Sequence, residues 1–151
     1  MRSQMVSMYS WTVRAIAYLS ITGSKEKKAF SEGLAVQTFE TALKQINLIE
    51  HPREYAMLQN NLGNALQYLQ STHPVENNLR AVTAYNEALK VRNPKDTPLE
   101  YANTIANKAN ALIDEQVKKA NDTLTGSQLE TRLAELEAKR ADIEKAKKRS
   151  E

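Results

Sequence analysis

The sequence contains no cysteine, which excludes disulfide bonds and thiolate chemistry. Glycine and proline are also scarce, with four of each in 151 residues. Because hairpin turns depend on such residues, and because apolar positions rarely alternate along the chain, a protein built from β-hairpins is not expected. The composition favours an all-α fold. The lack of cysteine suits a reducing compartment, and we expect the cytoplasm.

Long hydrophobic runs are lacking as well. The most apolar stretch, residues 6–21, is interrupted by Arg14. A membrane span needs about 20 apolar residues, and the central region of a signal peptide is uncharged. We therefore expect no membrane span and interpret the stretch as an amphipathic first helix, with a poor secretory signal as the alternative.

Motifs of catalysis are absent from the sequence. It has neither a glycine-rich phosphate loop nor a serine nucleophile elbow. His51 and His73 each precede a proline and share no arrangement of acidic ligands, which argues against a metal site. The formal net charge of +3 is a mild excess that does not favour a nucleic-acid partner. We expect no enzymatic activity, no cofactor and no metal.

One sequence segment occurs twice, 46 residues apart. Residues 51–66, HPREYAMLQNNLGNAL, correspond to residues 97–112, TPLEYANTIANKANAL, with Pro, Glu, Tyr-Ala, two Asn and Ala-Leu at matching positions. A second segment, residues 34–44, returns at the same offset as residues 80–90. Two segments that share one period indicate a stacked repeat protein.

The apolar spacing and the helix-start signals predict six helices. We expect Ser31 and Asn77 to cap the second and fourth helices, and Thr97 and Ser127 to begin capping boxes before the fifth and sixth. Lys25–Lys28 is expected to be a basic loop. Short connections force neighbouring helices to pack antiparallel. The predicted helices lie near residues 6–21, 32–48, 52–70, 78–92, 98–119 and 127–149.

The best-preserved repeat resembles a known family. The run NNLGNAL at residues 60–66, followed by Ala81, Tyr85 and Ala88, is similar to the tetratricopeptide repeat (TPR), whose two helices carry a Leu-Gly pair and then an Ala, aromatic, Ala series. Small residues, including Gly63, let the helices approach closely, and Tyr85 fills the space beside them. The period exceeds the usual 34 residues, and the surplus falls in two loops. This long-loop form resembles repeats of bacterial, especially cyanobacterial, proteins.

The resemblance implies a right-handed α-solenoid of antiparallel helix pairs. Its repeats would cover residues 1–126, at about 5–50, 51–96 and 97–126, and the outer ones are degenerate. Residues 127–151 are interpreted as a modified closing helix that covers the apolar edge of the stack, as terminal repeats must. Its outer half, from residue 137, is expected to project into solvent.

The resemblance also implies a concave groove, lined by the first helix of each pair, that holds an extended peptide or a partner's helix. Asparagine suits such a wall because its amide both donates and accepts hydrogen bonds; the alternative is that these amides are simply solvated. Trp11 is either a recognition anchor or a half-buried edge residue, and Asn61 and Asn107 are expected to be structural. A carboxylate clamp is not expected, because Ala106 and Asn110 stand where basic residues would be needed. The groove positions are Trp11, Arg14, Tyr18, Met57, Asn60, Asn64, Gln67, Tyr68, Asn103, Ala106, Asn110 and Ile113.

The C-terminal residues 138–151 are rich in Lys and Arg, and three interpretations stay open. They form a solvated helix, a short coiled-coil contact between chains, or a nucleic-acid contact through residues 145–149. The coiled-coil seam would be Leu129, Leu133, Leu136 and Ile143. We therefore expect a non-catalytic scaffold or adaptor that binds a protein or peptide. The alternatives are a nucleic-acid-binding helical protein and a regulatory subunit of an enzyme.

Overall fold

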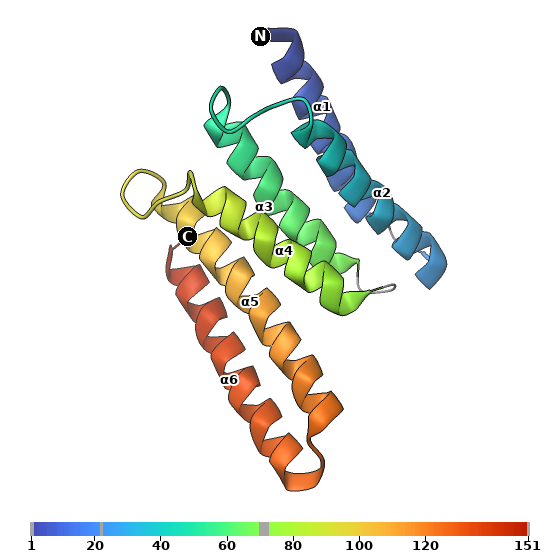
Figure 1. Ribbon diagram of the computed structural model, residues 1–151, viewed down its shortest axis with the longest axis vertical. Coiled ribbons are helices and arrows are strands. Elements are labelled where there is room, and N and C mark those ends of the chain that lie inside the picture. Colours follow the sequence, from blue (N-terminus) through green and yellow to red (C-terminus); the bar gives the residue numbers. More distant parts are fainter. Residues whose placement is uncertain (1, 22, 70–72, 151) are drawn as a thin grey trace.

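The computed structural model describes residues 2–21, 23–69 and 73–150, with side chains from residue 7 to residue 149. Within these ranges the chain is all-α and forms six helices, as predicted (Figure 1). The helices are α1 (Arg2–Leu19), α2 (Lys25–Leu43), α3 (Pro52–Tyr68), α4 (Pro74–Leu89), α5 (Pro98–Thr123) and α6 (Gly126–Ser150).

Each helix packs against the next one along the chain, and α3 also contacts α5. Figure 1 shows the consequence, which is a row of antiparallel pairs running from α1 and α2 to α5 and α6. The short connections impose this arrangement, because a few residues can join only neighbouring helix ends.

Helix α2 begins six residues before its predicted cap. Ser24 is the cap residue, and its hydroxyl accepts a hydrogen bond from the Lys27 backbone N–H at 3.3 Å. The predicted basic loop Lys25–Lys28 is therefore wrong, because these residues form the first turn of the helix. Ser31, the predicted cap, lies inside the helix and donates to the Lys27 carbonyl at 2.9 Å. The cap of α2 is therefore Ser24, which was not predicted, and not Ser31.

Helix α4 also begins earlier than predicted, at Pro74. Proline suits the first helical position because its missing N–H would have no partner there. Asn77, the predicted cap, is instead buried within the helix, where its amide donates to the Leu69 carbonyl. It therefore ties the start of α4 to the end of α3.

Two further caps differ from the prediction. Helix α5 begins at Pro98 as expected, but the Thr97 hydroxyl makes no cap hydrogen bond. It accepts from the Asn93 backbone N–H at 3.0 Å instead. Helix α6 begins at Gly126, whose φ of +57° suits glycine, so Ser127 lies inside the helix.

The 46-residue period is present in the loops as well as in the helices. The side-chain oxygen of Asn47 accepts the backbone N–H groups two and three residues further on, at 3.0 and 2.9 Å. Asn93 repeats this turn at 3.0 and 2.8 Å. The residues before α3 and α5, His51 and Thr97, have φ/ψ of −133°/60° and −135°/58°. The two connections therefore have nearly the same backbone geometry.

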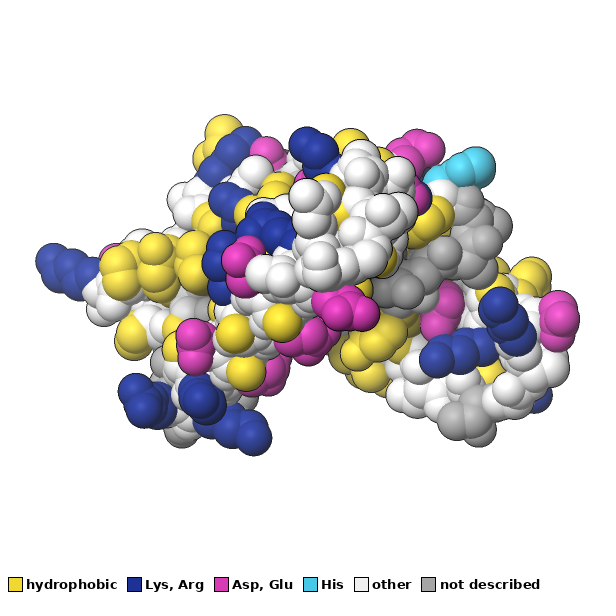
Figure 2. Space-filling view, turned by 90° about the horizontal axis from the view of Figure 1, so that it is seen from below, with side chains coloured by type: hydrophobic (Ala, Val, Ile, Leu, Met, Phe, Trp, Pro, Cys, Tyr) yellow, Lys and Arg dark blue, Asp and Glu magenta, His cyan; other side chains and the backbone are white. Residues whose placement is uncertain are grey.

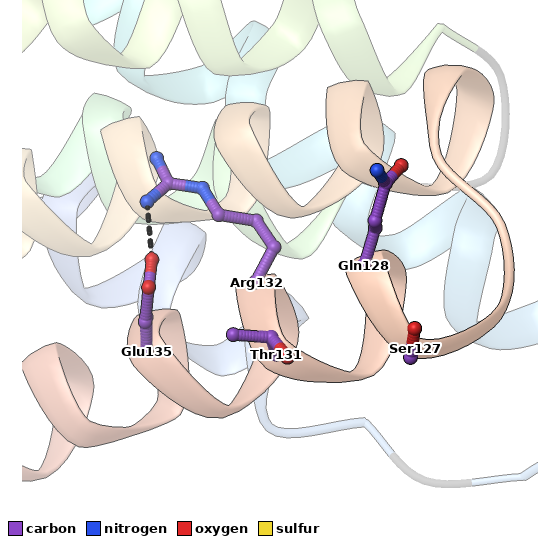
Figure 3. A pocket seen from close by; sticks show the side chains of 5 residues that line it. All are labelled: Ser127, Gln128, Thr131, Arg132 and Glu135. Carbon is purple, nitrogen blue, oxygen red and sulfur yellow. Dashed lines mark hydrogen bonds and ion pairs between the residues drawn. The ribbon is translucent and has the colours of Figure 1, made fainter.

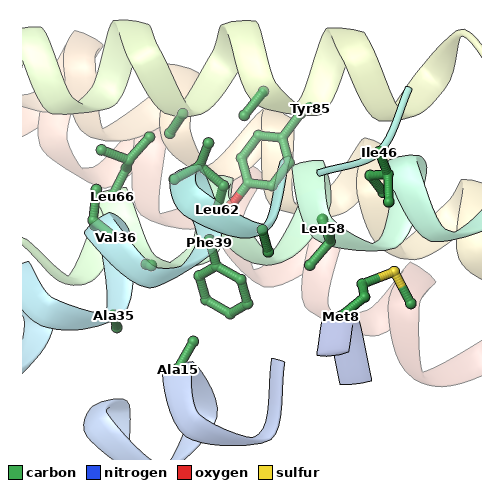
Figure 4. Packing of buried hydrophobic residues seen from close by; sticks show 14 of the residues in the cluster. Met8, Ala15, Ala35, Val36, Phe39, Ile46, Leu58, Leu62, Leu66 and Tyr85 are labelled. Carbon is green, nitrogen blue, oxygen red and sulfur yellow. The ribbon is translucent and has the colours of Figure 1, made fainter. Parts of the chain in front are cut away.

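Tyr85 lies at the centre of the core, with none of its surface exposed (Figure 4). It packs against Gly63, where an added Cβ would lie only 2.5 Å from the ring atom Cε1. The prediction that a small residue here allows close approach of the helices is confirmed. The ring joins α4 to α3 within one pair and meets Phe39 of α2 in the same hydrophobic cluster.

Helix α6 packs along α5 (Figure 1), so the prediction that the chain projects into solvent from residue 137 is wrong for the residues that the structure describes. Arg140 Nη2 contacts Asp114 Oδ1 at 2.5 Å, and Glu144 Oε1 accepts a hydrogen bond from Asn110 Nδ2 at 3.3 Å. The part that extends past α3 and α4 is instead the turn between α5 and α6. These helices have 26 and 25 residues, against 17 and 16 for α3 and α4.

Candidate partner-binding surface

On α3, two of the predicted groove residues are engaged with the core. The Tyr85 hydroxyl lies 2.7 Å from Asn64 Oδ1 and 2.6 Å from Gln67 Oε1. A phenol has one proton, so it donates to one amide oxygen while the other amide presents its NH₂ group. Burial raises the pKa of Tyr85 well above its ordinary value, which keeps the phenol neutral. Asn64 and Gln67 therefore hold the tyrosine in place.

Asn60 is buried beneath α5 rather than presented on a surface. The Thr104 hydroxyl lies 3.1 Å from Asn60 Oδ1 and accepts from Arg92 Nη1 at 2.7 Å. Burial lowers the pKa of the Arg92 guanidinium, and the charge of Glu100 opposes this shift. This polar chain across α3, α5 and the loop before α5 was not predicted from the sequence.

Two residues of this polar chain have apolar counterparts one period (46 positions) earlier. The counterparts of Arg92 and Thr104 are Ile46 and Leu58, both in the hydrophobic core. An apolar pair has therefore been replaced by a hydrogen-bonded polar pair at the same two positions. Such a paired replacement avoids the cost of leaving one buried polar group unsatisfied. The period and the paired change were both visible in the sequence and could have revealed it.

On α5, the predicted residues fall into two groups. Ala106 and Ile113 are buried, at 7% and 6% exposure. Asn103 is exposed, and its Oδ1 accepts from Asn107 Nδ2 at 3.0 Å. Asn110 donates to Glu144 Oε1 at 3.3 Å, while its own Oδ1 is buried without a hydrogen-bond partner.

On α1, an aromatic and a cationic side chain are stacked. The guanidinium of the exposed Arg14 lies 5.2 Å from the centroid of the Trp11 ring, within the range of a cation–π contact. Trp11 is half-buried and donates from Nε1 to Ser7 Oγ at 3.1 Å. Tyr18, one turn beyond Arg14, is half-buried against the core.

Only some of the predicted groove residues are therefore accessible at the surface. Met57 is half-buried against the core, and Tyr68 is 60% exposed at the end of α3. Figure 2 shows the surface notched between the lobe formed by α1 and α2 and the rest of the molecule, with basic and acidic side chains interspersed over much of this face. Asn64 and Gln67 are half-accessible but bonded to Tyr85. The other accessible or half-accessible residues are Trp11, Arg14, Tyr18, Met57, Tyr68, Asn103 and Asn110.

A separate hollow lies at the projecting end of α6, lined by five residues from Ser127 to Glu135 (Figure 3). Its one cation, Arg132, bonds Glu135 at 2.9 Å and Gln116 of α5 at 3.0 Å. Because this guanidinium is already paired, the hollow offers no free charge for a ligand.

Neither a metal-binding cluster nor a membrane-spanning helix is present among the described residues. No group of three or more His, Cys, Asp or Glu side chains is placed to hold a metal ion. No helix within residues 2–21, 23–69 and 73–150 is long and apolar enough to cross a bilayer.

At the end of α6, Lys147, Lys148 and Arg149 occupy the last turn, where cations stabilise a helix.

The fold and the site define the class of molecule: an all-α protein of antiparallel helix pairs with a 46-residue repeat in sequence and loop geometry. Comparison with known proteins adds no relative to this description, since no family model, no curated protein and no solved structure matches the chain.

Proposed function

We propose that the chain is a TPR-like right-handed α-solenoid and that it works as a non-catalytic protein-interaction module. The observation that carries this proposal is the period itself. The same offset of 46 residues relates the helix sequences, the asparagine turns at Asn47 and Asn93, and the backbone angles before α3 and α5. Repeats that stack in this way produce extended surfaces, which such proteins use to bind partners.

The surface we propose is the row of accessible side chains on α1, α3 and α5. Arg14, Tyr68 and Asn103 are the most exposed of the predicted positions, one on each of these helices. They combine a cation, an aromatic ring and an amide, which suit an extended peptide or a partner's helix. The buried members of the set, Asn60 above all, hold the helices in register and do not contact the partner.

The test is capture of partners from the native host with the purified full chain, followed by affinity measurement on the purified partner. Tyr68→Ala combined with Asn103→Ala should weaken binding by about tenfold or more, because interface energy concentrates in a few anchors. The matched control is Asn86→Ala, which removes an exposed amide from α4. An affinity unchanged in the double variant would remove the proposed surface and leave the fold untouched.

The basic end of α6 supports a second candidate, binding of nucleic acid. Lys145, Lys148 and Arg149 are exposed in its last two turns. Because α6 packs along α5, truncation would expose core residues, so Lys145→Gln with Lys148→Gln is the cleaner perturbation. Salt-sensitive binding of single-stranded RNA or DNA that this variant loses would favour the second candidate over the first.

A further inference from the structure

An apolar stripe on α1 is left uncovered. Tyr9, Val13 and Ile16 follow one another at spacings of four and three residues, so they share one face of the helix. They are 51%, 68% and 49% exposed. A different face of the helix carries Met8 and Ala15, at 1% and 0%. Helix α1 therefore packs on the rest of the described chain with one side only.

One period later, on α3, the equivalent row is more deeply buried. The counterparts of the stripe are Tyr55 and Gln59, which are half-buried, and Leu62, which is 8% exposed. Helix α3 has a helix ahead of it in the chain, α2, that packs against it. Val36 and Phe39 of α2 share a hydrophobic cluster with Leu62, and Figure 4 shows them together. The Tyr55 hydroxyl donates to Glu87 of α4 at 2.7 Å, so α2 covers this row at Leu62 and α4 covers it at Tyr55.

Helix α5 provides a second comparison. Ile105 stands two periods after Val13 and is 38% exposed, against 68% for Val13. A helix ahead of it, α4, packs against α5 as well. The row is thus better covered on α3 and α5, each of which follows another helix in the chain, than on α1. Among the residues that the structure describes, nothing occupies the equivalent place on α1.

Helix α1 and the first turn of α2 carry more cations than acids. Helix α1 contains no Asp or Glu, so no acidic side chain of its own helix borders the stripe. The first turn of α2 adds Lys25, Lys27 and Lys28 against the single exposed acid Glu26. A second copy of the chain would bring the same cations to its own stripe, and like charges disfavour that contact. A partner that carries carboxylates is therefore the better match.

We propose that the stripe of Tyr9, Val13 and Ile16 docks an amphipathic α-helix of acidic character from a partner protein, seated on α1 as α2 is seated on α3. This edge of the stack is a different surface from the row proposed above and does not depend on it. Three side chains make a small contact, so the complex forms and dissociates rapidly, with charge attraction speeding association.

The probe is a fluorescein-labelled peptide with the sequence of residues 29–48, because this segment includes the part of α2 that shares a hydrophobic cluster with Leu62 of the equivalent row on α3. It carries Glu32 and Glu40 against Lys44. Fluorescence anisotropy with the full chain should show saturable binding. Val13→Ser combined with Ile16→Ser should weaken it by about tenfold or more, because both lost groups are apolar contacts.

The matched control is Leu99→Ser, which removes a 55% exposed apolar side chain from α5 and should leave the peptide's affinity unchanged. Circular dichroism checks that the double variant is folded; if it is not, Val13→Ser alone takes its place. A peptide with Glu32→Lys and Glu40→Lys should bind more weakly than the original.

Several results would overturn the proposal. They are absence of saturable binding, an equal loss in Leu99→Ser, and tighter binding of the lysine peptide. Sedimentation that reveals self-association lost in the double variant would assign the stripe to a second copy of the chain instead. Binding to phosphatidylserine vesicles that the same variant loses would assign it to a membrane surface.

Discussion

The contact between Gly63 and Tyr85 leads to a sharp prediction about Gly63→Ala. A Cβ at this position would lie 2.5, 2.7 and 2.9 Å from three atoms of the tyrosine ring. The ring cannot swing aside cheaply, because it is completely buried and its hydroxyl is held by Asn64 and Gln67. Either α3 and α4 must separate or the ring must leave its site.

The expected magnitude follows from two opposing terms. Overpacking of a core costs about 1–3 kcal/mol, and the severity of these contacts places this site at about 3 kcal/mol. Replacing glycine by alanine inside a helix returns about 1 kcal/mol. The free energy of unfolding should therefore fall by about 2 kcal/mol, which lowers Tm by about 4–8 °C for a chain of this size.

Gly33→Ala is the matched control, since this glycine is also inside a helix but an added Cβ would meet nothing within 4 Å. Here only the propensity term acts, and the free energy of unfolding should rise by about 0.5–1 kcal/mol. Urea unfolding followed by circular dichroism measures both variants. The reasoning would be refuted if Gly63→Ala were as stable as Gly33→Ala. When Tyr85 is replaced by Leu, Gly63→Ala should change the free energy of unfolding much less, because the clash requires the tyrosine ring.

Three further predictions rest on hydrogen bonds. Asn64→Ala should lower the free energy of unfolding in urea by about 1–3 kcal/mol, because the buried Tyr85 phenol loses a hydrogen-bond partner. Asn110→Ala, at the equivalent position, should lower it by less than about 1 kcal/mol, because the Asn110 carbonyl has no partner to lose. Equal losses would contradict the roles assigned to the two asparagines. Thr104→Val should cost about 1–3 kcal/mol because it leaves the Arg92 guanidinium without its partner, and Thr104→Ser should restore most of this stability. Hydrogen bonds from Lys90 and Tyr55 lower the pKa of Glu87 in the folded protein below its ordinary value of 4.5. The ionised Glu87 therefore stabilises the fold fully above pH 4.5, and this contribution is lost as the pH falls through the pKa of the folded state. Chemical unfolding between pH 6 and pH 3 should therefore show a smaller loss of stability on acidification in Glu87→Gln than in the wild type.

The structural features that could be predicted from the sequence are those that depend on local residue patterns. Helix number, helix order and the close approach at Gly63 follow from apolar spacing and from one small residue. Helix starts were less predictable, because serine is a suitable cap residue and α2 has one at Ser24 as well as at Ser31. The burial of Asn60 depends on Thr104, which is 44 residues away in the chain. No local pattern around Asn60 carries that information.

The two matched asparagines show how far a repeat allows roles to be transferred between positions. Asn64 and Asn110 are one period apart, and both were expected to line the groove. Asn64 is bonded by Tyr85, which stands 21 residues further on, but the residue 21 positions after Asn110 is the exposed Thr131. Without an aromatic hydroxyl on α6, the Asn110 carbonyl has no donor. A repeat therefore conserves backbone positions, while the role of a side chain depends on whether its partner residue is repeated too.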